Sequence, residues 1–357
     1  MLSTILRRSL APAASVALLV AVAAPAAAAR GDAVVAEHLV GPLTFDVQGN
    51  GSLVVGESFM GALTAIPRGG SATHLVGPSP FDIAAVSVQG NEVTYGRTTL
   101  DPETGEPVAA VLMRLGRDGT PVQVADLRGY ENGANPDGAQ SYGIDTTGLS
   151  PECVASVPPF LLPAPGHQDS HPYGSVTRGD VTYVADAGAN DVLAVTRSGA
   201  VSTVAVLPPV TVPITAAAVA ANRLDPCLVG ASIALEAVPT DVEVGPGGLL
   251  YVSSLPGGPE DGSLGANGRV YTVDPRTGAV HLLAGGFAGA TNVAVGPGGT
   301  VYVAELFADR VSAISPSGAV STFATLSQPA AVEVAGGRLY ASTHVFGDGS
   351  IVSFPVP

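Results

Sequence analysis

The chain is poor in positive charge, in cysteine and in long hydrophobic segments, and each shortage excludes a class of protein. Its 15 basic residues, all of them arginine, face 30 acidic residues, which gives a formal net charge of −15. An acidic surface repels phosphate backbones and anionic lipid headgroups, so we expect neither nucleic acid nor a membrane surface as a partner. After residue 30, no segment is long and apolar enough to span a bilayer.

The common motifs of catalytic and nucleotide sites are also missing. There is no Gly-x-Ser-x-Gly nucleophile elbow, no phosphate loop and no dinucleotide fingerprint. The glycine-rich runs stand between predicted strands, whereas a phosphate-binding loop leads from a strand into a helix. A Ser-His-Asp triad stays open, because it is a spatial arrangement that no sequence spacing reveals.

The first 29 residues predict an export signal. Arg7 and Arg8 precede an apolar stretch at 13–24, and the alanines at 26–29 offer an Ala-x-Ala cleavage site. A basic region, a short apolar region and small residues in this order are typical of a secretory signal peptide. We therefore expect Sec-dependent export and a mature, secreted chain that begins near residue 30.

The two cysteines, Cys153 and Cys227, are too few to form a metal site by themselves. In an exported protein an even pair favours a disulfide bond over two free thiols. We predict that these two residues are joined.

The remaining composition is that of many short strands separated by turns. The chain contains 45 glycines and 30 prolines. Residues 239–286 show the pattern clearly: four apolar segments at 240–244, 249–253, 269–273 and 279–284, with Gly-Pro-Gly-Gly and Asp-Pro-Arg-Thr-Gly in the first and last connections. Proline fixes φ for a turn and glycine accepts positive φ, so both sequences predict tight hairpins.

This unit repeats along the chain, which predicts a β-propeller. Similar units occupy 42–76, 80–127, 172–207, 239–286, 289–326 and 329–356. A seventh unit would have to lie within 128–170, which lacks the repeat. The last unit has only three strands, and the segment 33–40 resembles the missing outer strand. We therefore predict an all-β, six-bladed propeller in one domain, residues 30–357, whose last blade is closed by the N-terminal strand.

The long connections all fall on one face of the predicted propeller, which we call the top face. It carries the second-to-third and the fourth-to-first connections of each unit. The two largest insertions are 128–171 and 208–238, and a shorter one spans 256–268. The segment 213–224 predicts one short helix. Loops on one face of a rigid scaffold commonly carry function, and the predicted disulfide would join the two large insertions.

Several stretches resemble the ScyD/ScyE family of exported proteins: NPDG (135–138), SHPYG (170–174), VADAGANDVLAVTRSGAVSTVAVLP (184–208), VPTDVEVGPGGLLYVSSLPG (238–257) and ANGRVYTVDPRTG (266–278). The resemblance covers most of the mature chain and implies an NHL/SMP-30-like β-propeller. It supplies no catalytic residues to carry over.

Candidate site residues lie at the top end of the innermost strands. Asp241, Asn292 and Glu243 converge there if the repeats align, and His171 and Tyr173 stand where the third unit begins. Oxygen ligands from Asp241 and Asn292 could hold Ca²⁺. The alternative is that these side chains hydrogen-bond backbone groups of neighbouring blades or line a watery channel.

Two functions from different classes follow from these residues. The first is a binding or scaffold module that uses its top face to hold an extracellular protein, a glycan or a small molecule. The second is a metal-dependent hydrolase of lactones or esters, as in propeller lactonases of the gluconolactonase type. We expect a monomer in either case. The sequence favours the first and leaves open whether the protein is an enzyme.

Overall fold

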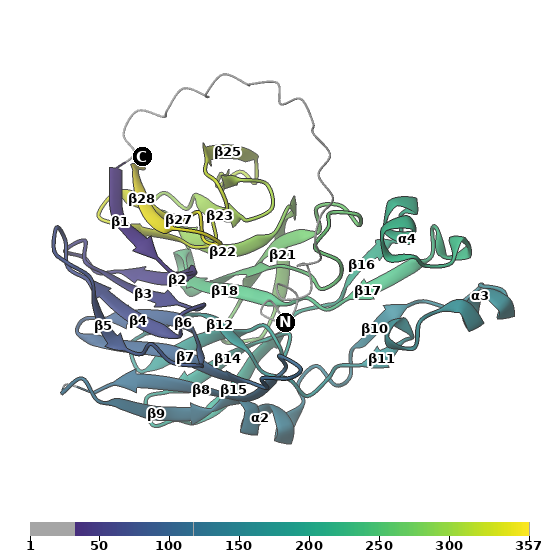
Figure 1. The fold of residues 1–357 in the computed structure, drawn as a ribbon, viewed down its shortest axis with the longest axis horizontal. Coiled ribbons are helices and arrows are strands. Elements are labelled where there is room, and N and C mark those ends of the chain that lie inside the picture. The colour runs from purple at the N-terminus through teal and green to yellow at the C-terminus, as the bar shows by residue number, and fades with distance from the viewer. Residues whose placement is uncertain (1–32, 117, 357) are drawn as a thin grey trace.

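The computed structural model describes residues 33–116 and 118–356 (Figure 1). The expected signal peptide, residues 1–29, lies outside this part of the chain. The described residues are mostly β-structure, organised as seven four-stranded antiparallel sheets. Within the same residues, no helix combines the length and the apolar character that crossing a membrane requires.

Five of these sheets are built from consecutive strands that pair in chain order. Sheet 1 contains β2 (Pro42–Val47), β3 (Leu53–Glu57), β4 (Ala62–Ile66) and β5 (Thr73–Val76). Sheet 2 contains β6 (Asp82–Gln89), β7 (Glu92–Leu100), β8 (Pro107–Leu115) and β9 (Pro121–Asp126). Sheet 3 contains β12 (Pro172–Arg178), β13 (Val181–Asp186), β14 (Asp191–Thr196) and β15 (Val201–Val206).

Sheets 4 and 5 follow the same plan. Sheet 4 contains β18 (Pro239–Val244), β19 (Leu250–Ser254), β20 (Gly268–Val273) and β21 (Val280–Phe287). Sheet 5 contains β22 (Ala290–Val295), β23 (Val301–Glu305), β24 (Arg310–Ile314) and β25 (Val320–Thr325). The turns have the expected chemistry: in the first turn of sheet 4, Gly247 and Gly248 take φ values of 72° and 76°, a conformation that glycine adopts without steric cost.

Sheet 6 combines the two ends of the described chain. It contains β26 (Val332–Ala335), β27 (Arg338–Thr343) and β28 (Gly349–Pro355), with β1 (Ala33–Leu39) as its outer strand. β1 pairs antiparallel with β28, with Ala33 opposite Ser353 and Leu39 opposite Gly349. The pairing expected for the segment 33–40 is therefore present.

The core lies between the sheets. One buried apolar cluster fills each contact between consecutive sheets, and another joins sheet 6 to sheet 1 through Leu39, Phe45 and Ile351. The first strands of the six sheets contact one another in turn, and β26 also contacts β2. In Figure 1, the first strands β2, β6, β12, β18 and β22 lie nearer the centre than the outer strands of their sheets. The inner strands of these six sheets are thereby packed on both faces, which a single sheet could not achieve.

The two large insertions fold into a structure of their own, where the sequence led us to expect loops with one short helix. Four strands, β10 (Ser141–Ile144), β11 (Ala164–Pro165), β16 (Val210–Pro213) and β17 (Ser232–Leu235), form the seventh sheet. With α3 (Pro151–Ser156) and α4 (Ala216–Asn222) they form a projection that we call the arm, residues 141–165 and 210–235 (Figure 1). The predicted helix within 213–224 is α4. A further helix, α2 (Leu127–Ala134), leads from sheet 2 toward the arm.

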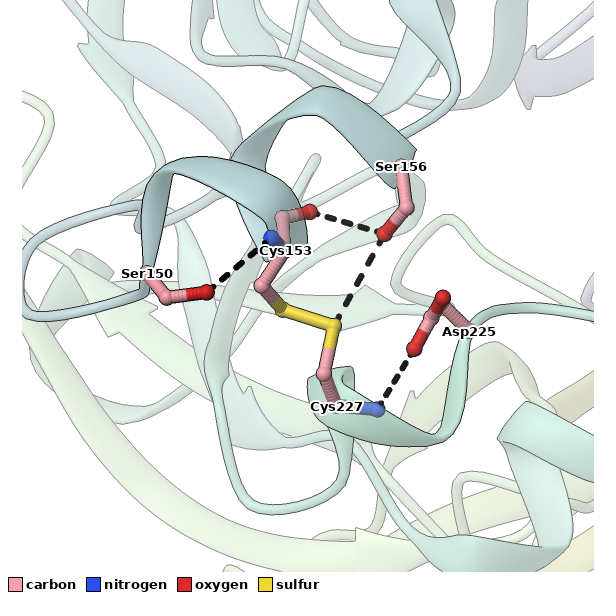
Figure 2. The surroundings of a disulfide bond; sticks show 5 residues. All are labelled: Ser150, Cys153, Ser156, Asp225 and Cys227. Atoms are coloured by element: carbon pink, nitrogen blue, oxygen red, sulfur yellow. Dashed lines mark hydrogen bonds between the residues drawn. A yellow bond between two sulfur atoms is a disulfide. The ribbon is translucent and has the colours of Figure 1, made fainter.

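The arm has a hydrophobic core and a disulfide. Ile144, Val210 and Leu228 belong to its buried cluster, together with Cys153. Cys153 and Cys227 are bonded, as predicted, with their Cα atoms 5.9 Å apart. Figure 2 shows how short helical segments present both sulfurs. The Cys153 N–H donates to Ser150 Oγ at 3.2 Å, and the Cys227 N–H donates to Asp225 Oδ1 at 2.9 Å.

We expect the disulfide to stabilise the arm locally. It closes a loop of 74 residues, for which chain entropy predicts roughly 4 kcal/mol at most. The hydrophobic core of the arm is separate from the clusters between the six sheets. Replacing both cysteines (Cys153→Ser with Cys227→Ser) should therefore leave the melting transition of the six sheets within about 2 °C of the wild-type value. The same replacement should make the arm sensitive to limited proteolysis. A large loss of the main transition would show instead that the arm and the sheets unfold as one unit.

Candidate functional site

Apolar side chains pack together at one end of the innermost strands, in a cluster that we call the plug. Five of the six sheets contribute to a buried cluster there: Leu43, Tyr173, Ala187, Val238, Leu306, Ala330 and Val345. Each residue lies near the start of a first strand or the end of a second strand, so all of them meet at one end of the innermost strands. This plug covers the position at which the sequence placed a channel mouth.

Below the plug, side chains from four of the six first strands (β2, β6, β18 and β22) accept hydrogen bonds from the backbone of the next sheet. Asp241 Oδ2 accepts from the Val293 N–H at 3.1 Å, and Asn292 Oδ1 accepts from the Val332 N–H at 2.8 Å. Sheets 1 to 3 are joined in the same way, through Val86 N–H to Thr44 Oγ1, Val88 N–H to Asp46 Oδ2 and Thr177 N–H to Ser87 Oγ. The innermost strand is an edge strand, and these acceptors satisfy its free N–H groups.

Asp241 and Asn292 are thus both buried and both engaged with backbone groups. A Cβ added at Gly174 would stand 2.3 Å from Asp241 Oδ1, so the absence of a side chain there makes room for this carboxyl group. Within the described residues, no three His, Cys, Asp or Glu side chains are arranged as a ready metal site. The role of Asp241 and Asn292 as metal ligands stays a prediction, and the hydrogen bonds give them a structural role.

Four carboxyl groups still face one another along the channel. Burial raises the pKa of Asp46 to about 6 and that of Asp241 to about 7, and for Asp241 the Asp46 charge adds to the effect. Glu243 and Glu333 belong to the same group. Their pKa values are raised well above the usual range, mainly by burial and in addition by repulsion from neighbouring carboxylates. Burial and mutual repulsion therefore favour the protonated form of these carboxyl groups.

The structure brings His171 and Tyr173 together. His171 Nε2 lies 2.8 Å from Asp82 Oδ2, which ties β12 to β6, and the edge of its ring meets the Tyr173 ring at 6.2 Å between centroids. The Tyr173 hydroxyl is buried and has no hydrogen-bond partner among the described residues. Burial and the nearby carboxylates of Asp82, Glu260 and Asp241 raise its pKa, so it remains a neutral donor.

A cavity that the sequence did not predict opens on the top face between sheets 4 and 5. Its volume is about 450 Å³, and its walls come from the arm, the loop between β19 and β20, and the turn between β23 and β24. The larger side chains among its lining residues include those of Leu235, Val238, Glu260, Leu264, Asn267 and Phe307. This volume is within the range of small-molecule sites, and the mostly apolar lining with few polar groups is typical of them.

The wall that carries Phe307 is held in place by hydrogen bonds to Glu305. Glu305 is fully buried, and its carboxylate accepts from the Ala288 N–H at 2.9 Å and from Arg310 Nε at 2.7 Å. The Phe307 ring lies over Gly289, where an added Cβ would stand 2.7 Å from it. Exposed phenylalanines recur at related turns of sheets 1 and 6, as Phe59 and Phe346, whose rings stack at 6.1 Å. This repetition was visible in the sequence and could have indicated an aromatic top face.

Comparison with known proteins shows the fold. No protein-family model and no curated protein matches the chain. Among solved structures, it is similar to the PQQ-bound aldose sugar dehydrogenase of Streptomyces coelicolor (14% identity, 90% of this chain and 96% of that one, TM-score 0.54). It is also similar to a gluconolactonase of Xanthomonas campestris (11%, 91% and 87%, 0.52) and to a catalytically inactive virginiamycin B lyase of Staphylococcus aureus (12%, 90% and 98%, 0.50). At these identities the likeness establishes a propeller-type fold.

Substitutions at Asp241 separate the structural role from a metal role. Asp241→Asn keeps an oxygen for the Val293 N–H and removes a buried charge, so the melting temperature at pH 8 should stay the same or rise. Asp241→Ala leaves that N–H without a partner and should cost about 1–3 kcal/mol. Thermal unfolding and elemental analysis of both variants test this. If the wild type holds a metal ion and both Asp241→Asn and Asp241→Ala lose it, the assignment of Asp241 to a structural role is contradicted.

The channel carboxyls predict a specific pH dependence. A carboxyl whose pKa is higher in the folded protein than in the unfolded chain binds its proton more tightly when folded, so stability falls as pH rises through the folded pKa. This window runs from about pH 4 up to about 6 for Asp46 and up to about 7 for Asp241. Melting temperatures measured across it should decline less steeply in Asp46→Asn than in the wild type. Parallel curves would show that Asp46 does not titrate there.

Proposed function

We propose that the chain is a six-bladed β-propeller, completed by β1, that acts as a binding module and holds a small, largely apolar molecule in the top-face cavity. The cyclic contacts of the first strands, including that of β26 with β2, support the blade count and the closure. The observation that carries the function is the cavity itself. It combines a volume of about 450 Å³ with an apolar lining and a wall held in place by hydrogen bonds.

The charge of the protein narrows the class of ligand. The chain has a net charge of −15, and Glu260 is the acidic side chain among the lining residues. An anionic ligand would be repelled by both, whereas a neutral or cationic molecule would not. Asn267 and the glycine-rich backbone of the surrounding loop supply the polar contacts that orient a ligand. We therefore propose a neutral or cationic ligand with a sizeable apolar part.

We also propose that the protein is exported and that it belongs to the ScyD/ScyE family. The signal-like segment at 1–29 motivates secretion, and the Cys153–Cys227 disulfide agrees with an oxidising compartment. The stretches quoted above motivate membership of the ScyD/ScyE family. A metal-dependent hydrolase is the less favoured alternative, because Asp241 and Asn292 already serve as acceptors for backbone N–H groups. An extracellular protein or a glycan would need a broader surface than this cavity.

Binding of a neutral apolar dye tests the proposal. Nile red should bind one site per chain with enhanced fluorescence, and the anionic dye anilinonaphthalene sulfonate should bind more weakly. Phe307→Ser should weaken Nile red binding by roughly tenfold or more, because burying an aromatic face contributes about 1.5–3 kcal/mol.

Phe59→Ser is the matched control. Phe59 and Phe307 are 48% and 43% exposed, and each ring lies over a glycine at the start of its sheet. The Phe59 variant should bind within about twofold of the wild type, since Phe59 does not line the cavity. Equal losses in both variants, or none in Phe307→Ser, would rule out this cavity as the site.

A further inference from the structure

Four buried carboxyl groups gather where α2 and the loop after it pack against sheet 3. Glu131 lies on α2, Asp137 follows in the loop that leads to the arm, and Asp186 and Asp191 lie on β13 and β14. Glu131 is 1% exposed, and each of the three aspartates is 0% exposed. We call these four residues the acid cluster. An ionised carboxylate is costly to bury, so each of them needs hydrogen-bond donors, a counter-charge or a proton of its own.

The hydrogen bonds of the cluster leave several acceptor oxygens without a donor. Both carboxylate oxygens of Asp186 are satisfied, by Ser170 Oγ at 2.6 Å and by three backbone N–H groups. In contrast, Glu131 Oε1, Asp137 Oδ1 and Asp191 Oδ1 are buried without a hydrogen-bond partner among the described residues. The cluster therefore holds more acceptors than the surrounding donors can satisfy.

Positive charge near the cluster is scarce. Arg128, on the same helix, is paired with Asp169 at 2.6 Å. Among the described residues, no group of three His, Cys, Asp or Glu side chains is placed to hold a metal ion. The other titratable groups that act on the cluster come from the segment before β12, from β10 and from the residue after β17: His167, Asp169, His171, Tyr142 and Glu236. Two of these add negative charge, so the carboxyl groups need another source of donors.

A retained proton supplies the missing donor. The O–H of a protonated carboxyl group can donate to a neighbouring oxygen, and the same proton removes one of the repelling charges. Burial, followed by the charges of Asp186 and Asp137, raises the pKa of Glu131 to about 8. Burial and the charges of Asp186 and Glu131 raise the pKa of Asp191 well above its usual range. The unpartnered oxygens and the raised pKa values thus lead to the same conclusion, that the cluster holds protons at neutral pH.

The position of α2 depends on this cluster. Leu127, the first residue of the helix, is buried in the apolar cluster between sheets 2 and 3, whereas Glu131 lies in the acid cluster. Gly129 and Gly133 both stand within the eight residues of the helix. A glycine inside a helix costs roughly 0.5–1 kcal/mol relative to alanine. The helix therefore has little stability of its own, and its second half needs the contacts of Glu131.

Asn190, in the turn between β13 and β14, connects the acid cluster to the top-face cavity. Its Nδ2 donates to Asp137 Oδ2 at 2.9 Å, and its Oδ1 accepts from the Val238 N–H at 3.0 Å. Val238 is one of the residues that line the cavity. The loop after α2 and the wall of the cavity are therefore joined through one side chain.

We propose that the acid cluster is a pH-sensitive latch, in which retained protons hold α2 and the base of the arm against sheet 3, and loss of these protons releases both. A carboxyl group that is protonated in the closed state and ionised in the open state favours closure at acid pH. For Glu131, closure weakens as the pH rises from about 4.5 toward about 8. Because Asn190 holds Val238, opening also loosens the cavity. This last consequence rests on the proposed function, whereas the latch itself does not.

Glu131→Gln in the full chain tests the latch, because an amide keeps a donor and cannot ionise. Limited proteolysis should cut α2 and the arm of the wild type faster as the pH rises. Comparing the two proteins at the same pH cancels the pH dependence of the protease. The ratio of the wild-type cleavage rate to that of Glu131→Gln should rise roughly tenfold or more between about pH 5.5 and about pH 8.5. Glu103→Gln, the same change in an exposed turn, should be cleaved as the wild type is.

Infrared spectroscopy detects the proton directly. The difference spectrum of wild type minus Glu131→Gln at about pH 6.5 should contain the carbonyl band of a protonated carboxyl group, and this band should disappear above about pH 8. Glu131→Gln should melt at or above the wild-type temperature at about pH 8, which shows that it folds. A cleavage ratio that does not change with pH, or a difference spectrum that contains only ionised carboxylate, overturns the latch.

Nile red separates the latch from the proposed function. If the latch controls the cavity, the affinity for the dye should fall with rising pH in the wild type and stay constant in Glu131→Gln. Dye binding that ignores pH while proteolysis shows opening contradicts only the connection through Asn190. A working latch in a protein that binds no dye at any pH contradicts the proposed function and leaves the latch established.

Discussion

Every sheet of the central structure has an inner edge that must be satisfied without another strand. The inner strand pairs with its own sheet on one side, and its other side faces the channel, where no further strand fits. Acceptors from the preceding sheet solve this problem, as Asp241 does for the Val293 N–H and Asn292 for the Val332 N–H. The same bonds set the spacing of the sheets, and the apolar clusters between the sheets depend on that spacing.

This constraint explains why polar residues at the channel are a weak guide to chemistry. Thr44, Asp46 and Ser87 lie on the first strands of sheets 1 and 2 and accept from backbone groups as well. An aspartate at such a position satisfies the edge at the expense of a buried charge, which its raised pKa reflects. The top-face cavity, in contrast, has no such role in the scaffold.

The sequence predicted the structural elements that depend on local residues and that repeat along the chain. Gly-Pro-Gly-Gly and Asp-Pro-Arg-Thr-Gly determine turns by their own conformational limits, so the strands around them were found from the residues alone. The arm was missed because β10 and β17 are short strands far apart in the sequence, with no turn between them to indicate pairing. The Cys153–Cys227 bond was predictable from the cysteine count, whereas the top-face cavity depends on tertiary contacts between segments far apart in the sequence.

The pairing of β1 with β28 has a consequence for how the molecule is made. Residue 33 finds its partner at residue 353, so this contact spans almost the whole described chain. Until β28 is synthesised, the backbone groups of β1 have no partner strand. Contacts of such long range slow folding and prolong the exposure of strand edges. The nascent protein therefore depends on being kept from aggregation until its last strand is available.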